Sequence, residues 1–251
     1  MTATLSIIFG LLGMAVGSFL NVCADRLPER KSLLSPPSHC DSCQRRLAAA
    51  DLVPVFSYIF LLGRCRYCGA RIPLRVPLVE LATGATFAFL FWYFGLTWQF
   101  WLYIVYASVL LVLAVIDLQR GLLLNVIVYP AAALALVVGF FVPEFSIYKG
   151  VLGGAVGFAA LALVVLISRG GMGWGDVKMA GLIGLMTGFP AVFPALLLGI
   201  VAGGFIAALL LLTGKKSRKD AVPFGPFLAL GAFVALIWGQ QLIHWYTGIF
   251  R

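Results

Sequence analysis

Long apolar runs follow one another along almost the whole chain, and they restrict its fold more than any other feature of the sequence. A helix that crosses the ~30 Å hydrocarbon core of a bilayer needs roughly 20 mostly apolar residues. About eight segments approach this requirement, at 5–22, 79–95, 99–116, 123–142, 150–167, 178–192, 194–212 and 226–247. Only 11% of the residues are charged, too few for a soluble enzyme or a nucleic-acid-binding protein. We therefore expect an all-α integral membrane protein with about eight transmembrane helices.

The basic residues predict how these helices are oriented. The chain carries 18 Lys and Arg against 9 Asp and Glu, a formal net charge of +9. If the N-terminus lies outside the cytoplasm, every basic residue except Lys149 and Arg251 falls in a cytoplasmic loop, where membrane proteins concentrate Lys and Arg. We expect both termini on the outer side of the membrane and no nucleic-acid partner. The first run lacks a basic segment before it, so we expect a retained anchor rather than a signal peptide.

Glycines recur at helical spacing within several of the runs, as in Gly13/Gly17, Gly153/Gly157 and Gly199/Gly203. Such pairs let helix backbones approach closely in lipid. We expect them to mark packing contacts between helices and assign them no other function.

Residues 23–78 form the one polar segment large enough for a small domain, so we divide the chain into 1–22, 23–78 and 79–251. The segment holds two Cys-x-x-Cys pairs, Cys40/Cys43 and Cys65/Cys68. Two such turns suit a tetrahedral site of four thiolates, and a segment with so little apolar core needs a staple. We expect a cytoplasmic loop domain that binds structural Zn²⁺.

Other interpretations of the cysteines remain open from the residues alone. Disulfide or redox use is disfavoured by the reducing compartment that the charge pattern predicts. An iron–sulfur site, or a degenerate loop that binds no metal, fits the spacing too. His39 is a competing ligand, and Cys23 stands alone at the end of the first run, where we expect it to pack inertly.

An apolar stretch of 11 residues, Leu52–Leu62, lies inside the same segment. It is too short to cross a membrane. We expect either an interfacial or re-entrant helix or the local core of the loop.

Three acidic residues adjoin apolar runs, where a carboxylate is costly unless it is solvated or paired. Asp117 follows the third run and Asp176 precedes the sixth, so the predicted topology places both at the cytoplasmic face. Glu80 begins the second run. Helix capping is the structural alternative for each of them. A transporter or channel whose acids bind ions is the alternative at the level of function.

Two carboxyl groups held together in a low-dielectric cleft cannot both ionise easily, so they share a proton. One of them then activates water and the other protonates a leaving amine, which is the chemistry of aspartyl peptide hydrolysis. The glycines before Asp176 allow a substrate backbone to approach closely. We expect Asp117 and Asp176 to be catalytic, with a bell-shaped dependence of rate on pH.

At this point the sequence resembles a known family. Gly173-Trp174-Gly175-Asp176 is similar to the GxGD signature of intramembrane aspartyl proteases, and further motifs follow the order seen in bacterial type IV prepilin peptidases. Those motifs are Gly17-Ser18-Phe19-Leu20-Asn21-Val22, Arg26-Leu27-Pro28, the two cysteine pairs, Pro77-Leu78-Val79-Glu80-Leu81, Asp117-Leu118, Gly173–Lys178 and Pro223-Phe224-Gly225-Pro226-Phe227. The family's Ile-Pro-Asn is replaced by Leu123-Leu124-Asn125, which removes a helix-starting residue but no catalytic group.

The resemblance implies that the protein cleaves the basic leader from prepilins and pseudopilins, just before their hydrophobic helix. It implies Asp117 and Asp176 as the catalytic acids and Gly173, Gly175 and Lys178 in the active-site loop. It also implies methylation of the new N-terminus with S-adenosylmethionine, for which the residues are unassigned. Glu80 is a candidate for that step or for a buried pair with an arginine. It further implies a location in the bacterial inner membrane, with both termini in the periplasm and with membrane lipids as the remaining partners. An aspartyl protease of the signal-peptide-peptidase type is disfavoured, because Ile116 stands where that type has Tyr.

Overall fold

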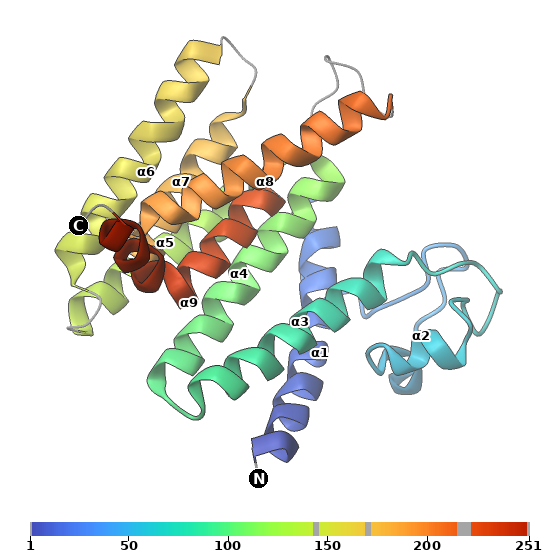
Figure 1. Cartoon of the computed structure of the whole chain (residues 1–251). Coiled ribbons are helices and arrows are strands. Elements are labelled where there is room, and N and C mark those ends of the chain that lie inside the picture. The colour runs from blue at the N-terminus through green and yellow to red at the C-terminus, as the bar shows by residue number, and fades with distance from the viewer. Residues whose placement is uncertain (1, 143–145, 169–171, 215–221, 250–251) are drawn as a thin grey trace. The chain divides into compact units, whose positions relative to one another are not determined.

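The described residues of a computed structural model are 2–142, 146–168, 172–214 and 222–249. Helices joined by turns make up these ranges, and no strand is formed within them, apart from two isolated bridges (Figure 1). The elements are α1 (Thr2–Arg26), the 3-10 helix η1 (Ala49–Leu52), α2 (Phe56–Phe60), α3 (Arg75–Phe94), α4 (Trp98–Arg120), α5 (Asn125–Phe141), α6 (Ile147–Ser168), α7 (Trp174–Thr187), α8 (Val192–Leu212) and α9 (Gly225–Ile249). The predicted all-α class is confirmed.

Each of the apolar runs in the sequence corresponds to a helix. Six described helices, α1, α3, α4, α6, α8 and α9, are long and apolar enough to cross a membrane. The helix α5 is apolar but shorter, and α7 has 14 residues. The chain turns after α7 at Gly188, whose φ of 72° suits glycine, so α7 ends before the predicted limit at residue 192. The chain is a multi-pass membrane protein.

The chain divides into two compact units, Met1–Val112 and Leu113–Arg251, with the boundary inside α4. In the first unit, α1 packs along α3. A side chain on Gly13 would clash with Phe87, and one on Gly17 would clash with the backbone of Glu80. These glycines therefore mark the packing contact that their spacing predicted.

In the second unit, α6 packs along α7 and α8 along α9 (Figure 1). The first contact is a crossing of glycines, because a Cβ atom on Gly184 would overlap the carbonyl of Gly153. In the second, Gly199 lies against the backbone of Leu228. The close packing of α6 and α7 leaves α7 largely buried along its length, which fixes the end of α7 that carries Asp176.

Some of the charged residues counted in the sequence, and some of the glycines before Asp176, lie outside the described ranges. They are Glu144, Gly170, Gly171, Arg169, Asp220, the basic cluster at 215–219 and Arg251. The residues predicted for the active site and the metal site all lie within the described ranges.

Candidate active site and metal site

Asp117 lies in the last turn of α4 and is almost fully buried, with 6% of its surface exposed. Its Oδ2 accepts a hydrogen bond of 2.7 Å from the backbone N–H of Gly225, the first residue of α9. The first N–H groups of a helix have no partner within the helix, so the carboxylate satisfies one of them. This bond holds the Asp117 side chain in one orientation. Its Oδ2 atom is bound to the amide, and its Oδ1 atom stays outside this contact.

Asp176 lies in the first turn of α7, which begins after Gly173. Its side chain is half-buried and lies beside the backbone of Gly173, the residue before the helix. Gly175 lies against Leu123, since a Cβ atom there would come within 3.1 Å of the Leu123 Cβ atom. The residue that replaces the usual isoleucine therefore packs on the glycine-rich turn.

The carboxyl group of Asp117 lies close enough to Asp176 for its charge to act on it. Both belong to the second unit, although they come from different helices. Lys178, two residues after Asp176, donates a hydrogen bond of 3.0 Å from its Nζ atom to Oδ1 of Asn125 at the start of α5. The ends of α4, α5, α7 and α9 thus supply the two acids, the backbone amide bonded to Asp117, and the contact between Lys178 and Asn125. Two acids so placed have the composition needed for general acid–base chemistry.

Two residues of this cluster were not identified as site residues from the sequence. Gly225 contributes a backbone amide, which leaves no side-chain signal, although its motif was part of the family resemblance. Asn125 was noted only as part of a departing motif. Its amide side chain at a helix start was a signal, because such a residue at a membrane boundary needs a polar partner.

The four paired cysteines meet in the first unit. The Sγ atoms of Cys40, Cys43, Cys65 and Cys68 all lie within 4.8 Å of one another, and those of Cys40 and Cys68 are 3.8 Å apart. None of the five cysteines, all of which are described, forms a disulfide. Tetrahedral coordination with a Zn–S distance of about 2.3 Å requires sulfurs about 3.8 Å apart. The cluster therefore fits a metal ion of the predicted kind.

Four thiols this close cannot all ionise by themselves. Backbone hydrogen bonds from Cys43 and Ser42 lower the pKa of the Cys40 thiol to about 6. Although the Ala70 backbone lowers the pKa of Cys68, desolvation and the neighbouring thiols raise it to about 12. A divalent cation supplies the positive charge that lets all four sulfurs act as thiolates. His39 hydrogen-bonds through Nδ1 to the Pro37 carbonyl and does not belong to the cluster.

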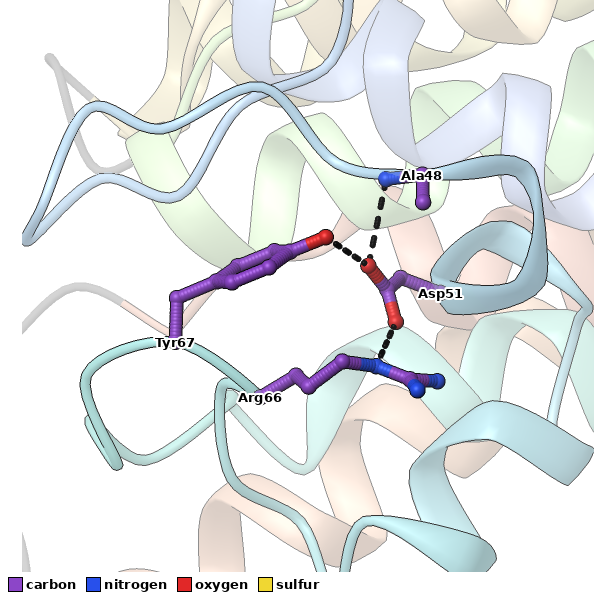
Figure 2. Close-up of polar contacts among 4 residues, drawn as sticks. All are labelled: Ala48, Asp51, Arg66 and Tyr67. Atoms are coloured by element: carbon purple, nitrogen blue, oxygen red, sulfur yellow. Dashed lines mark hydrogen bonds and ion pairs between the residues drawn. The ribbon is translucent and has the colours of Figure 1, made fainter.

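Asp51 braces the second cysteine turn (Figure 2). Its Oδ1 accepts a 2.6 Å bond from Nε of Arg66, and its Oδ2 accepts bonds from the Tyr67 hydroxyl and the Ala48 N–H. Arg66 and Tyr67 are the two residues between Cys65 and Cys68, so the Asp51 carboxylate stabilises this turn through the two side chains that the cysteines enclose. These hydrogen bonds outweigh desolvation and keep the pKa of Asp51 below its ordinary value.

Glu80 is 4% exposed and lies in the second turn of α3. Its Oε2 accepts a bond of 2.7 Å from the N–H of Val55, which precedes α2. No arginine among the described residues pairs with it, since Arg75 bonds to Asp25 instead. The alternative of a buried Glu–Arg pair is therefore wrong. Nearby, Asn21 donates to the Val76 carbonyl while its Oδ1 stays buried without a partner in the described structure.

Comparison with protein-family models gives two matches that follow each other along the chain. Residues 11–94 match the Bacterial Peptidase A24 N-terminal domain, and residues 104–208 match the Type IV leader peptidase family. The first match contains the cysteine cluster, Asp51 and Glu80, and the second contains Asp117 and Asp176.

Curated relatives resemble the chain over nearly its whole length. Three of them are named prepilin leader peptidase/N-methyltransferase. The protein of Bacillus subtilis is 34% identical over 96% of this chain and 97% of its own length. Those of Stutzerimonas stutzeri and Pseudomonas aeruginosa are each 32% identical, over 96% and 94% of this chain and 93% and 91% of their own lengths. No solved structure matches the chain significantly.

Proposed function

This chain belongs to the family of the prepilin leader peptidases/N-methyltransferases, and we propose that it removes the leader peptide from prepilins or pseudopilins of type IV pili and type II secretion. The observation that supports the proposal is that Asp117 and Asp176 belong to one compact unit, close enough for the charge of Asp117 to act on Asp176. Two acids at helix ends, with a close-packed glycine turn beside one of them, are the parts that hydrolysis of a peptide bond requires.

In the proposed reaction, a water molecule lies between the two carboxyl groups. The ionised one takes a proton from the water as its oxygen attacks the scissile carbonyl carbon, and the protonated one hydrogen-bonds the developing oxyanion. The proton taken from the water then passes to the amide nitrogen as the carbon–nitrogen bond breaks. The products are a leader with a new carboxyl group and a pilin with a new amine. The amide of Gly225 keeps Asp117 oriented throughout.

The protein acts, in this proposal, in the bacterial inner membrane with both termini in the periplasm. Residues 1–22 form the first transmembrane helix, 23–78 the cytoplasmic zinc-binding domain and 79–251 the peptidase domain. Cys40, Cys43, Cys65 and Cys68 hold Zn²⁺, which stabilises the loop. Gly173, Gly175 and Lys178 shape the active-site turn, and the contact of Lys178 with Asn125 supports that role by joining α7 to α5.

The second proposed activity is methylation of the amine that cleavage produces, with S-adenosylmethionine as the donor. Its support is the name carried by the relatives that align over nearly the whole chain. Glu80 remains a candidate for this step, because its carboxylate is buried in α3, which packs along the helix that carries the unpaired oxygen of Asn21. We expect a purified prepilin to lose its leader on incubation with the enzyme, and to gain one methyl group only when the donor is added, as measured by mass spectrometry.

The peptidase assignment predicts the effect of removing either acid. Asp117→Asn and Asp176→Asn keep the shape of the side chain but remove its proton chemistry, so we expect each to lower cleavage by at least about 10³-fold. Asp41→Asn is the matched control, since the Asp41 side chain is exposed and lies in the other unit. Cleavage is measured in detergent with equal amounts of inserted protein.

Near-normal cleavage by either variant would remove that acid from the mechanism. An ion transporter or channel, the alternative function, predicts no loss of leader even with the wild-type protein. None of the comparisons supports that alternative.

A further inference from the structure

The apolar stretch at residues 52–62 does not form a core. Of its side chains only Val55 is buried, whereas four large ones around α2 are exposed. These are Phe56 (46% exposed), Ile59 (60%), Phe60 (81%) and Leu62 (85%), which we name the apolar ridge. Leu62 also has a φ of 51°, a conformation that is unfavourable for leucine and that needs support from its surroundings. Surface this apolar on a polar loop requires a partner.

The apolar ridge is fastened near the end of a membrane helix. The bond from Val55 N–H to Glu80 ties the first residue before α2 to the second turn of α3. With 20 residues, α3 is about 30 Å long, the thickness of the hydrocarbon core. Glu80 is therefore within about 8 Å of the end of α3, and so near one edge of the hydrocarbon core that α3 would span. The bond from Val55 to Glu80 ties the apolar ridge to this edge.

Two arginines that follow the apolar ridge in sequence form a pair. Arg64 and Arg71 face each other across an isolated antiparallel bridge, and both are exposed. Residues directly opposite in such a bridge project to the same side, and like charges there oppose the pairing. Neither guanidinium pairs with a carboxylate among the described residues. An anion between them removes the repulsion.

The acids of the loop leave this charge uncompensated. Glu29 pairs with Lys31, Asp51 with Arg66, and Asp25 with Arg75, while the exposed Asp41 forms no ion pair with either arginine in the described structure. The positive charge of Arg64 and Arg71 therefore stays available to an external anion. A basic leader peptide is excluded as the partner of the two arginines, because its charge has the same sign. An apolar substrate helix would occupy the ridge without the arginines, and the crosslinking experiment below distinguishes it from lipid.

We propose that the apolar ridge and the pair Arg64/Arg71 dock together on an anionic membrane surface. Phe60 and Leu62 insert at the boundary of the acyl chains, and the two guanidinium groups bind lipid phosphates. Apolar side chains flanked by basic ones are the pattern of segments that lie in the membrane interface. This inference goes beyond the proposed function, because it assigns a lipid-binding surface outside both acids and the cysteine cluster.

A photocrosslinking experiment identifies the occupant of the apolar ridge. The full-length protein carries p-benzoylphenylalanine in place of Phe60 and is reconstituted in nanodiscs of phosphatidylcholine alone or mixed with phosphatidylglycerol. After illumination, intact-mass analysis reveals what is attached. We expect a phospholipid adduct that increases in the anionic nanodiscs and decreases at high salt. A protein adduct instead, or an equal lipid yield in both membranes, would overturn the proposal.

Charge variants test the arginine pair in the same assay. Each basic residue near an anionic surface changes occupancy about fivefold. We expect Arg64→Gln with Arg71→Gln to reduce the adduct in anionic nanodiscs to the level found in phosphatidylcholine. The control Arg30→Gln with Arg46→Gln removes equal charge elsewhere in the loop and should keep the anionic preference. An equal loss in both variants would show an effect of net charge and contradict a specific site.

An apolar variant separates docking from folding. Leu62→Asn removes the apolar side chain and introduces a residue type that tolerates positive φ. Leu34→Asn is its control, because Leu34 is 90% exposed but lies outside the apolar ridge. Hydrogen exchange of residues 56–72 in anionic nanodiscs should accelerate in the Leu62 variant alone. Metal content should be equal in both, which shows that the loop is folded. Unchanged exchange in the Leu62 variant would exclude insertion of the ridge.

Discussion

At the scale of the residue, Asp117 shows how a side chain and a backbone amide from distant parts of the chain form one unit. Gly225 is buried against the carboxylate, and a Cβ atom there would come within 2.8 Å of Oδ2. The position therefore requires glycine for space rather than for a special backbone angle. A carboxylate displaced by even about 1 Å loses the geometry that acid–base catalysis requires.

Gly225→Ala should consequently reduce cleavage without removing any catalytic group. We expect a decrease of about 10²-fold, because the methyl group pushes the Asp117 carboxylate out of place. Gly204→Ala is the matched control, since nothing lies within 4 Å of a Cβ atom at that position of α8. Cleavage kinetics measured on both variants check this, and equal activities would contradict the role of Gly225.

Asp51 gives a prediction about pH at the same scale. Its pKa is lowered in the folded loop, so its stabilising effect is present above the unfolded pKa of about 3.9 and is lost as pH falls through the lower folded value. Asp51→Asn should loosen residues 48–67 at neutral pH, and its difference from wild type should shrink below about pH 4. Hydrogen exchange measures this difference. Asp41→Asn, at an exposed position, should match the wild type throughout.

At the scale of the element, α7 depends on contact with α6. The carbonyl of Gly153 occupies the space that a side chain on Gly184 would need, whereas Gly181 has its nearest neighbour, Cβ of Phe158, at 3.5 Å. Backbones this close gain dispersion contacts that lipid does not replace. The position of Asp176 at the start of α7 follows from that packing.

Gly184→Ala should therefore destabilise the second unit by about 1–3 kcal/mol, because the extra methyl group forces the helices apart. Gly181→Ala, on the same helix, has room for its methyl group and should have an effect close to zero. Thermal unfolding in detergent compares the two variants. A Gly184 variant as stable as the Gly181 variant would show that the two helices tolerate separation.

At the scale of the whole molecule, the two compact units have separate tasks in the proposed function. The cysteine cluster belongs to the first and both acids belong to the second. Each unit has its own packed helices, α1 with α3 in one and α6 with α7 in the other. Loss of metal should therefore affect the first unit without unfolding the second.

Cys65→Ser with Cys68→Ser tests this division. We expect the bound zinc to fall from about one ion per chain to none, since two of four thiolate ligands are lost. Limited proteolysis should then cut within residues 27–74 while the second unit stays intact. Cys23→Ser is the control, because the Cys23 thiol is buried in α1 outside the cluster. Wild-type protein without stoichiometric zinc would contradict the metal assignment.

The sequence by itself determined the helices, because burying backbone in lipid allows few alternatives and each span needs a long apolar run. It also determined the cysteine cluster, since two Cys-x-x-Cys turns suit a tetrahedral site of four thiolates. The acids at 117 and 176 were identifiable because carboxylates beside apolar runs are costly. Helix ends were less exact, as for α7, where local turn geometry decides.

Only the tertiary structure decided which groups bind the polar side chains that adjoin the apolar runs. The amide of Gly225, the contact of Lys178 with Asn125 and the bond from Val55 to Glu80 join residues far apart in sequence. Backbone amides carry no side-chain signal, and partners across helices depend on how the glycine faces pack. Sequence patterns report the cost of placing a group in the membrane, whereas the identity of the partner that offsets this cost is a property of the packed chain.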